Sequence, residues 1–287
     1  MVIKMKMDLK RIDTPKLQLG EGTVWKADTG DILFVDIMGE TVYQKNIESD
    51  LLKEFYIGGT VGFLAIEDEE NIICAKNSDL VRVNLNTGEI TPLTDLGIAS
   101  HLRFNDGKCD SEGRLWVGTM VKDGASVNRE DNMGSFYCIE KGKITSSIDG
   151  MTIPNGMDWY HGKFYHVDTP TKKIYEYEQI ENQIEPIRVA VDLSGLQGGP
   201  DGFCMDANGN IWVAIWGGSC VLCFDSKTGI LLDRIEMPDQ CVTCCAFGGK
   251  NMQTLFITTA SDAEGNGGQL YQVELDVKGK TSNFIKM

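Results

Sequence analysis

Four polar residues in this chain have side chains that could bind a metal cation together. Glu21, Asn155 and Asp201 each come directly before a glycine, and Asn105 comes two residues before Gly107. Two carboxylates and two carboxamides form an all-oxygen ligand set of net charge −2, which Ca²⁺, Mg²⁺ or Mn²⁺ prefers. A single Asn-Gly or Asp-Gly dipeptide is most often only a turn. The metal hypothesis therefore depends on whether the fold brings the four residues together.

The elements that would position these residues repeat along the chain. A turn followed by a short apolar strand recurs six times, and the first residues of the copies are 41, 42, 49, 47 and 43 positions apart. The copies are Gly30–Asp36, Asn71–Ala75, Gly113–Gly118, Gly162–Asp168, Gly209–Ala214 and Met252–Thr258. A period of about 40–50 residues is typical of the four-stranded blades of a β-propeller. No segment of about 12 residues or more combines helical periodicity with helix caps.

The sequence therefore predicts an all-β fold, a six-bladed β-propeller with a central metal-binding channel, in which residues 1–287 form a single domain. We expect the N-terminal strand, near Lys4 to Ile12, to pair with strands from the C-terminus and complete one blade. A β-sandwich or barrel also has evenly spaced strands and is the alternative. Six copies at this period favour the propeller.

In a propeller the first strand of each blade lines the central channel, so equivalent positions on these strands meet. Counted back from the glycine that opens each repeat, Glu21, Asn105, Asn155 and Asp201 lie nine, eight, seven and eight residues earlier. The second repeat offers only Val61 or Gly62 at this position, and the sixth only Thr243 or Cys244. We therefore predict that the four polar side chains meet at one rim of the channel, where glycine allows the backbone turn that aims them inward.

A set of motifs accompanies these residues along the chain. They are Glu21-Gly22-x-Val24-Trp25, Arg103-Phe104-Asn105-Asp106-Gly107-Lys108, Gly118-Thr119-Met120, Asn155-Gly156-Met157-Asp158-Trp159, Pro200-Asp201-Gly202 and Phe247-Gly248-Gly249-Lys250-Asn251. As an ordered set they resemble the family of the senescence marker protein (regucalcin), gluconolactonase and the luciferin-regenerating enzyme. The resemblance runs from about Gly20 to Tyr271.

This resemblance implies a six-bladed propeller that holds one divalent cation in its channel and hydrolyses sugar lactones. By resemblance, Glu21, Asn155 and Asp201 match the metal ligands. Arg103 and Asn105 match residues that hold the substrate, and Asn105 also lies close to the metal in the family. The identity of the cation stays open among Ca²⁺, Zn²⁺, Mg²⁺ and Mn²⁺.

The sequence departs from the family pattern after Met120. Animal members of the family carry an acidic pair there, including a Glu that helps to hold the substrate, whereas this chain has Val121-Lys122-Asp123. Asp123 is the candidate for that role, and its shorter side chain bears on substrate preference.

The predicted chemistry is the opening of an aldonolactone ring such as that of gluconolactone. The cation would polarise the carbonyl group and stabilise the oxyanion of the tetrahedral intermediate. Asp201 is predicted to be both a metal ligand and the general base, and Arg103 to donate hydrogen bonds to sugar hydroxyls. Two alternatives stay open: hydrolysis of phosphotriesters at the same metal site, and a non-catalytic calcium-binding propeller.

Other catalytic groups are few. The chain has three histidines and no Gly-x-Ser-x-Gly elbow. His166, in mid-strand, is predicted to be a packed core residue, whereas His101 could lie at the channel mouth or on the surface. Asp36 and Asp168 end equivalent strands, where they could hydrogen-bond to the strand ends or buttress the channel loops.

Composition excludes several kinds of partner. A formal net charge of −15 disfavours nucleic acid and anionic membranes. No apolar run approaches the roughly 20 residues that span a bilayer, and the alternating N-terminus has no signal-peptide core. We therefore expect a cytoplasmic, monomeric protein whose partner is a small-molecule sugar lactone.

Nine cysteines without an export signal are expected to be reduced thiols. The spacing Cys220-x-x-Cys223 followed by Cys241-x-x-Cys244 is compatible with a zinc ribbon. Residues three apart on a strand, however, point to opposite faces. Buried thiols are therefore the favoured interpretation.

Overall fold

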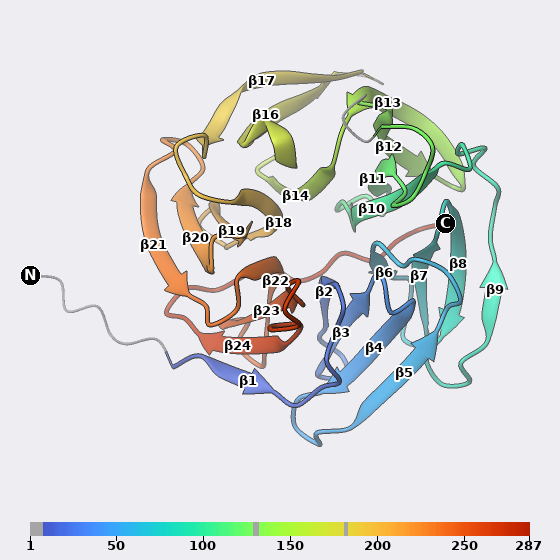
Figure 1. The fold of residues 1–287 in the computed structure, drawn as a ribbon, viewed down its shortest axis with the longest axis horizontal. Helices are drawn as coiled ribbons and strands as arrows, with labels where there is room; N and C mark the ends of the chain where they lie inside the picture. The colour runs from blue at the N-terminus through green and yellow to red at the C-terminus, as the bar shows by residue number, and fades with distance from the viewer. Residues whose placement is uncertain (1–7, 129–131, 181–182) are drawn as a thin grey trace, which may run out of the picture.

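The computed structural model describes residues 8–128, 132–180 and 183–287. Within these ranges the named elements are 24 strands and one short 3-10 helix, η2 (Thr169–Thr171). The strands form five sheets in a propeller-like ring around a central axis (Figure 1). The predicted all-β, propeller-like fold is confirmed.

Four of the sheets are antiparallel and four-stranded, and each strand pairs with the next one along the chain. The first contains β2 (Gly20–Lys26), β3 (Asp31–Asp36), β4 (Thr41–Asn46) and β5 (Leu52–Tyr56). The second contains β6 (Leu64–Ile66), β7 (Asn71–Lys76), β8 (Asp79–Asn84) and β9 (Ile90–Pro92). The third contains β10 (Leu102–Cys109), β11 (Leu115–Val121), β12 (Gly134–Glu140) and β13 (Lys143–Met151). The fourth contains β14 (Pro154–Tyr160), β15 (Lys163–Asp168), β16 (Lys173–Ile180) and β17 (Gln183–Asp192).

The fifth sheet has eight strands in two halves. One half contains β18 (Gly199–Met205), β19 (Asn210–Trp216), β20 (Cys220–Asp225) and β21 (Leu231–Glu236). The other contains β22 (Cys241–Gly248), β23 (Thr254–Ala260), β24 (Leu270–Glu274) and the N-terminal β1 (Lys10–Ile12). A single residue pair between β19 and β22, Trp216 with Cys241, joins the halves.

The two ends of the chain meet in this last sheet. β1 pairs antiparallel with β24, with Lys10 opposite Gln272 and Ile12 opposite Leu270. The predicted pairing of the N-terminal strand with the C-terminus is therefore confirmed for Lys10–Ile12, and its first residues, 4–7, lie outside the described ranges.

The hydrophobic core lies between the sheets. In the described part of the chain, six clusters of buried apolar side chains each join two successive four-stranded units. Trp116 of β11 packs on Phe164 of β15 with ring centroids 5.1 Å apart, and Trp25 of β2 stacks on Phe256 of β23 at 5.3 Å. Both faces of each sheet therefore pack against neighbouring sheets, and the inner strands line the central axis.

Buried aspartates shape the turns of two inner hairpins. Asp206 accepts hydrogen bonds from the backbone N–H groups of Asn208 and Asn210 and from the indole of Trp212. Asp110 holds the turn between β10 and β11 in the same way. These carboxylates fix the hairpins at the end of the inner strands remote from the predicted metal ligands.

All nine cysteines are free and buried, as predicted. Cys220 and Cys223 belong to different hydrophobic clusters, on opposite faces of β20. The zinc-ribbon alternative is therefore wrong, because these two thiols cannot bind one ion. Among the described residues, no helix is long and apolar enough to cross a membrane.

His166 on β15 is a packed core residue, as predicted. Its side chain is fully buried, its ring stacks on Phe136 at 4.2 Å, and Nδ1 lies 3.3 Å from the Gly156 carbonyl oxygen. Burial lowers the pKa of His166 to about 4.

We expect His166 to make the fold sensitive to acid. An unfolded histidine has a pKa of about 6.5, so between pH 6.5 and 4 the unfolded state binds a proton that the folded state does not. The free energy of unfolding therefore has its full value above this window and falls by about 3 kcal/mol as the pH drops through it. Free energies of unfolding in urea at pH 7.5 and pH 4.5 test this, and His166→Phe should lose about 2 kcal/mol less than the wild type. Equal acid losses in the two proteins would contradict the assignment.

Candidate functional site

The predicted site residues lie at β-bulges in the strands nearest the axis. These strands, β2, β6, β10, β14, β18 and β22, contact one another around the ring. Pairing slips by one residue between Glu21 and Val24, Phe104 and Gly107, Pro154 and Met157, and Pro200 and Phe203. A bulge kinks its strand and re-aims the side chains beside it. The equivalent slips therefore explain why these four strands present polar groups at one level of the axis.

Glycines let the inner strands approach one another at this level. A Cβ on Gly156 would lie 2.6 Å from the carbonyl oxygen of Asp201, and one on Gly202 would lie 2.8 Å from Sγ of Cys244. Of the three glycines that directly follow site residues, only Gly22 has a left-handed φ, +58°. The predicted role of glycine in allowing a backbone turn holds at Gly22. It is wrong at Gly156 and Gly202, where close packing of strands excludes a side chain.

Glu21 and Asp201 form a buried pair of carboxyl groups. They are 5% and 6% exposed and close enough to repel each other when both are ionised, and Asn155, whose Nδ2 donates to Oγ1 of Thr169 at 3.2 Å, lies beside Asp201. Burial, followed by repulsion from Asp201 and Asp106, raises the pKa of Glu21 well above its usual value. Burial and the charge of Asp106 raise the pKa of Asp201 in the same way. The pair is thus costly to ionise unless a positive charge lies beside it.

The donors fit a hard divalent cation by this criterion. Two buried carboxyl groups with raised pKa values and an adjacent amide supply oxygen ligands. When both carboxyl groups are ionised, one divalent ion would neutralise their two negative charges. Across the described ranges, no group of three or more His, Cys, Asp or Glu side chains is gathered as a metal site. The candidate site thus depends on amide oxygens as well as carboxylates. Its assignment as a metal site stays a prediction.

Asn105 is tied to Arg103. Nη1 of Arg103 donates to Oδ1 of Asn105 at 2.8 Å and to the Phe104 carbonyl oxygen at 3.0 Å. Nδ2 of Asn105 donates to the Pro154 carbonyl oxygen at 2.9 Å, which links β10 to β14. An amide oxygen has two lone pairs, so Oδ1 can still accept a second partner. The structure thus places Arg103 and Asn105 as one buried unit beside Asn155.

Asp123 is not part of this buried group. It is exposed on the loop after β11, at the rim where β10 begins, because Val121 pairs with Leu102. His101 is half-buried at the same rim, and its carbonyl oxygen accepts from the backbone of Lys122. A substrate role for Asp123 stays a prediction, and the two alternatives for His101 stay open.

Asp36 and Asp168 buttress the segments that lead into the inner strands. Asp36 accepts from the backbone N–H groups of Gln18 and Leu19 at 2.8 and 2.9 Å, just before β2. Asp168 does the same for two backbone N–H groups just before β14. These bonds join the end of one strand to the segment that leads into the next inner strand, so they fit both alternatives, hydrogen bonding at strand ends and buttressing.

Two residues near the site were given no role from the sequence. Asp106 is 8% exposed, and burial, opposed by Lys108, raises its pKa to about 6. It stands where three other inner strands have a glycine, which is the signal that could have revealed it. Cys244 accepts a hydrogen bond from Thr23 at 3.2 Å, and its thiol lies close to the Glu21 carboxyl group. The thiol thus contacts the carboxyl pair from the sixth repeat.

The ring of sheets with a buried acidic pair near its axis defines a propeller-like protein with a polar axial site. Residues 19–261 match the family described as SMP-30/Gluconolactonase/LRE-like region. The chain belongs to this family, as the sequence motifs predicted.

Individual relatives cover nearly the whole chain. YvrE of Bacillus subtilis, which carries the name of a sugar lactone lactonase, is 30% identical over 275 residues, 91% of this chain and 92% of that protein. The structure of a luciferin-regenerating enzyme superposes with a TM-score of 0.91 at 25% identity, over 98% of this chain and 100% of that one. A calcium-binding protein, regucalcin, from Agrobacterium tumefaciens superposes with a TM-score of 0.88 at 26% identity, over 96% and 97%.

Proposed function

We propose that this protein is a metal-dependent hydrolase that opens sugar lactones, with aldonolactones such as gluconolactone as substrates. The observation that carries the proposal is the buried carboxyl pair, Glu21 and Asp201, with Asn155 beside it, near the axis of a chain in this family. Membership of a family named for gluconolactonase supports the substrate class. A monomeric state and a cytoplasmic location stay predictions.

We further propose that the ring has six blades and that residues 1–287 form one domain. The eight-stranded sheet divides into two four-stranded halves, and in the part of the chain that the structure describes their strand pairing consists of the one pair Trp216 and Cys241. Six hydrophobic clusters in the described residues each join successive four-stranded units, and the cluster around Trp25 and Phe256 joins the last unit to the first. Both observations support counting the halves as separate blades.

Glu21, Asn155 and Asp201 are the residues that would hold one divalent cation, with Asn105 close by. A cation bound there supplies Lewis-acid polarisation of the lactone carbonyl and positive charge for the developing oxyanion. Oxygen donors favour Ca²⁺, Mg²⁺ or Mn²⁺, and Zn²⁺ stays open.

Asp201 is the residue that we assign as general base. Its carboxylate takes a proton from the attacking water as the water oxygen bonds to the carbonyl carbon. The ring C–O bond then breaks, a proton passes to the leaving oxygen, and the product is the open-chain aldonic acid. The new carboxylic acid ionises at neutral pH, so each turnover releases one proton into solution. Acid release therefore measures the reaction directly.

Arg103 is assigned to substrate orientation, and Arg103→Lys is expected to raise KM for the lactone about tenfold. Nη1 alone reaches both Asn105 and the backbone, and a lysine, with a single nitrogen on a flexible stem, cannot hold these acceptors and also present fixed donors to the substrate hydroxyls. Steady-state kinetics measure the change, with Arg82→Lys on β8, whose guanidinium pairs with Glu67, as the control. An unchanged KM in Arg103→Lys would contradict the role.

The substrate class is tested by acid release from a panel of aldonolactones and a panel of phosphotriesters at pH 7.5. We expect turnover of at least one aldonolactone and a much lower rate on every phosphotriester. Faster phosphotriester hydrolysis would overturn the lactonase assignment. Cation binding without turnover on either panel would instead support a non-catalytic calcium-binding propeller.

A further inference from the structure

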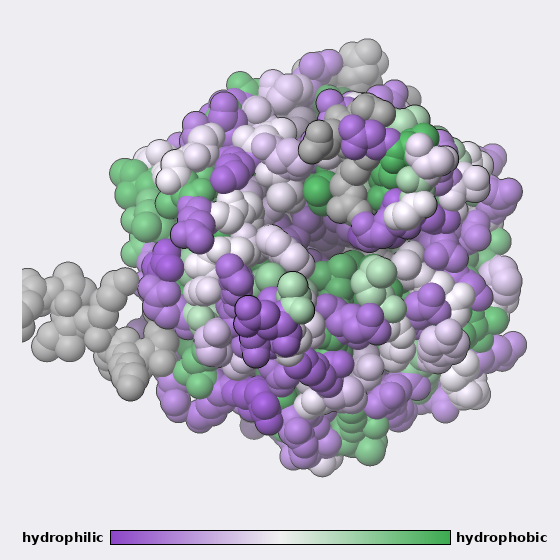
Figure 2. All heavy atoms as spheres, viewed as in Figure 1, coloured by the Kyte–Doolittle hydropathy of each residue, from purple (hydrophilic) through white to green (hydrophobic). Residues whose placement is uncertain are grey.

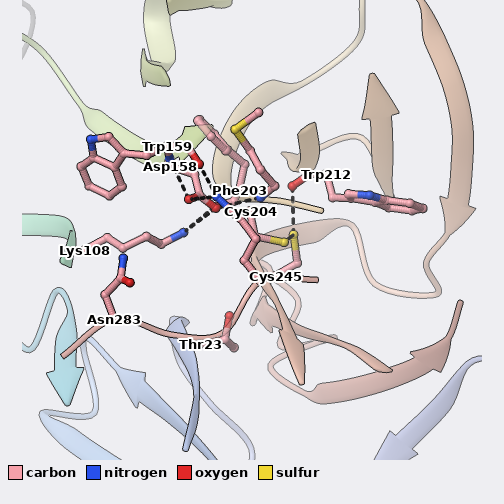
Figure 3. Close-up of polar contacts among 12 residues, drawn as sticks. Thr23, Lys108, Asp158, Trp159, Phe203, Cys204, Trp212, Cys245 and Asn283 are labelled. Carbon is pink, nitrogen blue, oxygen red and sulfur yellow. Dashed lines mark hydrogen bonds and ion pairs between the residues drawn. The ribbon is translucent and has the colours of Figure 1, made fainter. Parts of the chain in front are cut away.

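A cavity of about 340 Å³ lies along the inner strands beyond the carboxyl pair. It is lined by Thr23, Lys108, Asp158 and Cys204, which follow the site residues of their own strands by two or three positions. A strand rises about 3.3 Å per residue, so this cavity is a layer roughly 7–10 Å further along the axis. Figure 3 shows Lys108 pointing toward Asp158 in this layer. The cavity is therefore separate from the candidate metal site.

The C-terminal strap, residues 278–286, forms one wall of the cavity. Ser282 donates to the Trp25 carbonyl oxygen at 3.0 Å, and Asn283 donates to the Cys109 carbonyl oxygen at 3.0 Å. The backbone of Ile285 donates to β6, and the strap crosses the ring from β24 toward the C-terminus (Figure 1). Since these bonds reach three different sheets, the strap is fixed in place as a wall.

Two ammonium groups and one carboxylate are the charged groups of this lining. Nζ of Lys280 donates to Oδ1 of Asp158 at 2.7 Å and to the Trp159 carbonyl oxygen. Nζ of Lys108 donates to the Phe203 carbonyl oxygen at 3.1 Å and lies 3.7 Å from Oδ2 of Asp158. An ammonium has three N–H groups, and two protein acceptors are found for each within the described residues. Each lysine can therefore offer a further N–H to a ligand.

The charge of the lining is opposite to that of the chain as a whole. Among the lining residues, two lysines against one aspartate leave one positive charge in a protein of net charge −15; Asp106, which also interacts with Lys108, lies outside the lining. Burial opposes ionisation of Asp158, but Lys108 and Lys280 outweigh it and lower the pKa of that carboxyl. Asp158 is thus ionised, and the remaining positive charge suits a single anionic group.

The rest of the cavity is suited to an apolar group. Its apolar lining includes Leu64, Ile66, Trp159, Met205 and Phe247. A volume of about 340 Å³ is at the lower end of the range for small-molecule sites. Apolar walls with a few directed polar groups are the usual make-up of such sites.

We propose that this cavity is a second binding site, for a small monocarboxylate that carries an apolar group. The carboxylate accepts hydrogen bonds from Lys108 and Lys280, and the apolar group packs against Trp159 and Phe247. The inference does not depend on the lactonase assignment, because it uses none of the residues of the candidate metal site.

Benzoate is the probe, titrated into the full-length protein by calorimetry, with benzamide as its neutral counterpart and inorganic phosphate as a smaller anion. We expect one benzoate per chain with a dissociation constant below about 1 mM, and binding of benzamide and phosphate at least tenfold weaker. Lys280→Met should weaken benzoate binding about tenfold or more. Lys278→Met is the matched control, because Lys278 is exposed on the same strap and does not line the cavity.

Asp158→Asn is expected to tighten benzoate binding, where Lys280→Met weakens it. This second variant keeps the proposal testable even if Lys280→Met fails to fold. It keeps both lysines and removes the internal carboxylate that competes with the ligand, so benzoate should bind about tenfold more tightly. With the wild type, the ¹⁹F resonance of fluorinated Trp159, assigned by its loss in Trp159→Phe, should shift on adding benzoate. Absence of benzoate binding, equal affinities in Lys280→Met and Lys278→Met, or weaker binding in Asp158→Asn would overturn the proposal. Benzamide or phosphate binding as tightly as benzoate would also overturn it.

Discussion

Asp201→Asn is expected to lower the rate of lactone opening by about 10³-fold or more while the protein stays folded. The substitution removes the assigned general base and half of the anionic ligand charge, but it conserves the size of the side chain. It also relieves the repulsion between Asp201 and Glu21. In the presence of a chelator the variant should therefore unfold at a temperature at least as high as the wild type. Acid release and thermal unfolding measure the two effects.

Asp206→Asn is the matched control, because Asp206 lies in the same hairpin at its remote end. Asp206 is fully buried and caps the turn between β18 and β19. We expect this variant to lose about 1–3 kcal/mol of stability and to keep the kcat/KM of the folded enzyme. A wild-type kcat/KM in Asp201→Asn would contradict the role of Asp201.

Removal of divalent cations is expected to destabilise the protein, and more so at higher pH. The folded state raises the pKa values of Glu21 and Asp201, so it binds protons that the unfolded state has already released. In the cation-free protein, protonated Glu21 and Asp201 add to the free energy of unfolding at low pH. This contribution is lost as the pH rises through their raised pKa values. A cation replaces the protons, and at about 1,000 times its dissociation constant it should restore about 4 kcal/mol.

Urea unfolding at pH 5.5 and pH 8, with chelator or with added cation, measures this dependence. The gain from the cation should be larger at pH 8 than at pH 5.5, and it should be absent in Asp201→Asn. An equal gain at both pH values would show that the cation acts elsewhere, and an equal gain in Asp201→Asn would lead to the same conclusion.

The meeting of the four inner strands could be predicted because a hairpin glycine marks the repeat that follows each of them. Counting back from that glycine placed Asn155 and Asp201 at one level, although the spacing varies from seven to nine residues with the length of the hairpin. The bulges that aim these side chains were not predicted. These bulges lie where neighbouring inner strands pack closely, as Gly156 does against Asp201, and this packing involves residues far apart in the sequence.

The roles of Asp106 and the C-terminal strap also depend on tertiary structure. Asp106 comes between a predicted site residue and a glycine, and its proximity to Glu21 follows only from the ring. The strap has no periodic pattern, and its place as a cavity wall depends on where three different sheets end. The cysteine prediction succeeded for a local reason, because alternation along β20 alone separates Cys220 from Cys223.

The most direct test of the axial site is a titration of the metal-free protein with Mn²⁺ while acid release from gluconolactone is followed. We predict no turnover without cation, a rise in proportion to added Mn²⁺, and a plateau at one ion per chain that Asp201→Asn never reaches. Turnover by the metal-free protein at the rate of the loaded enzyme would contradict it.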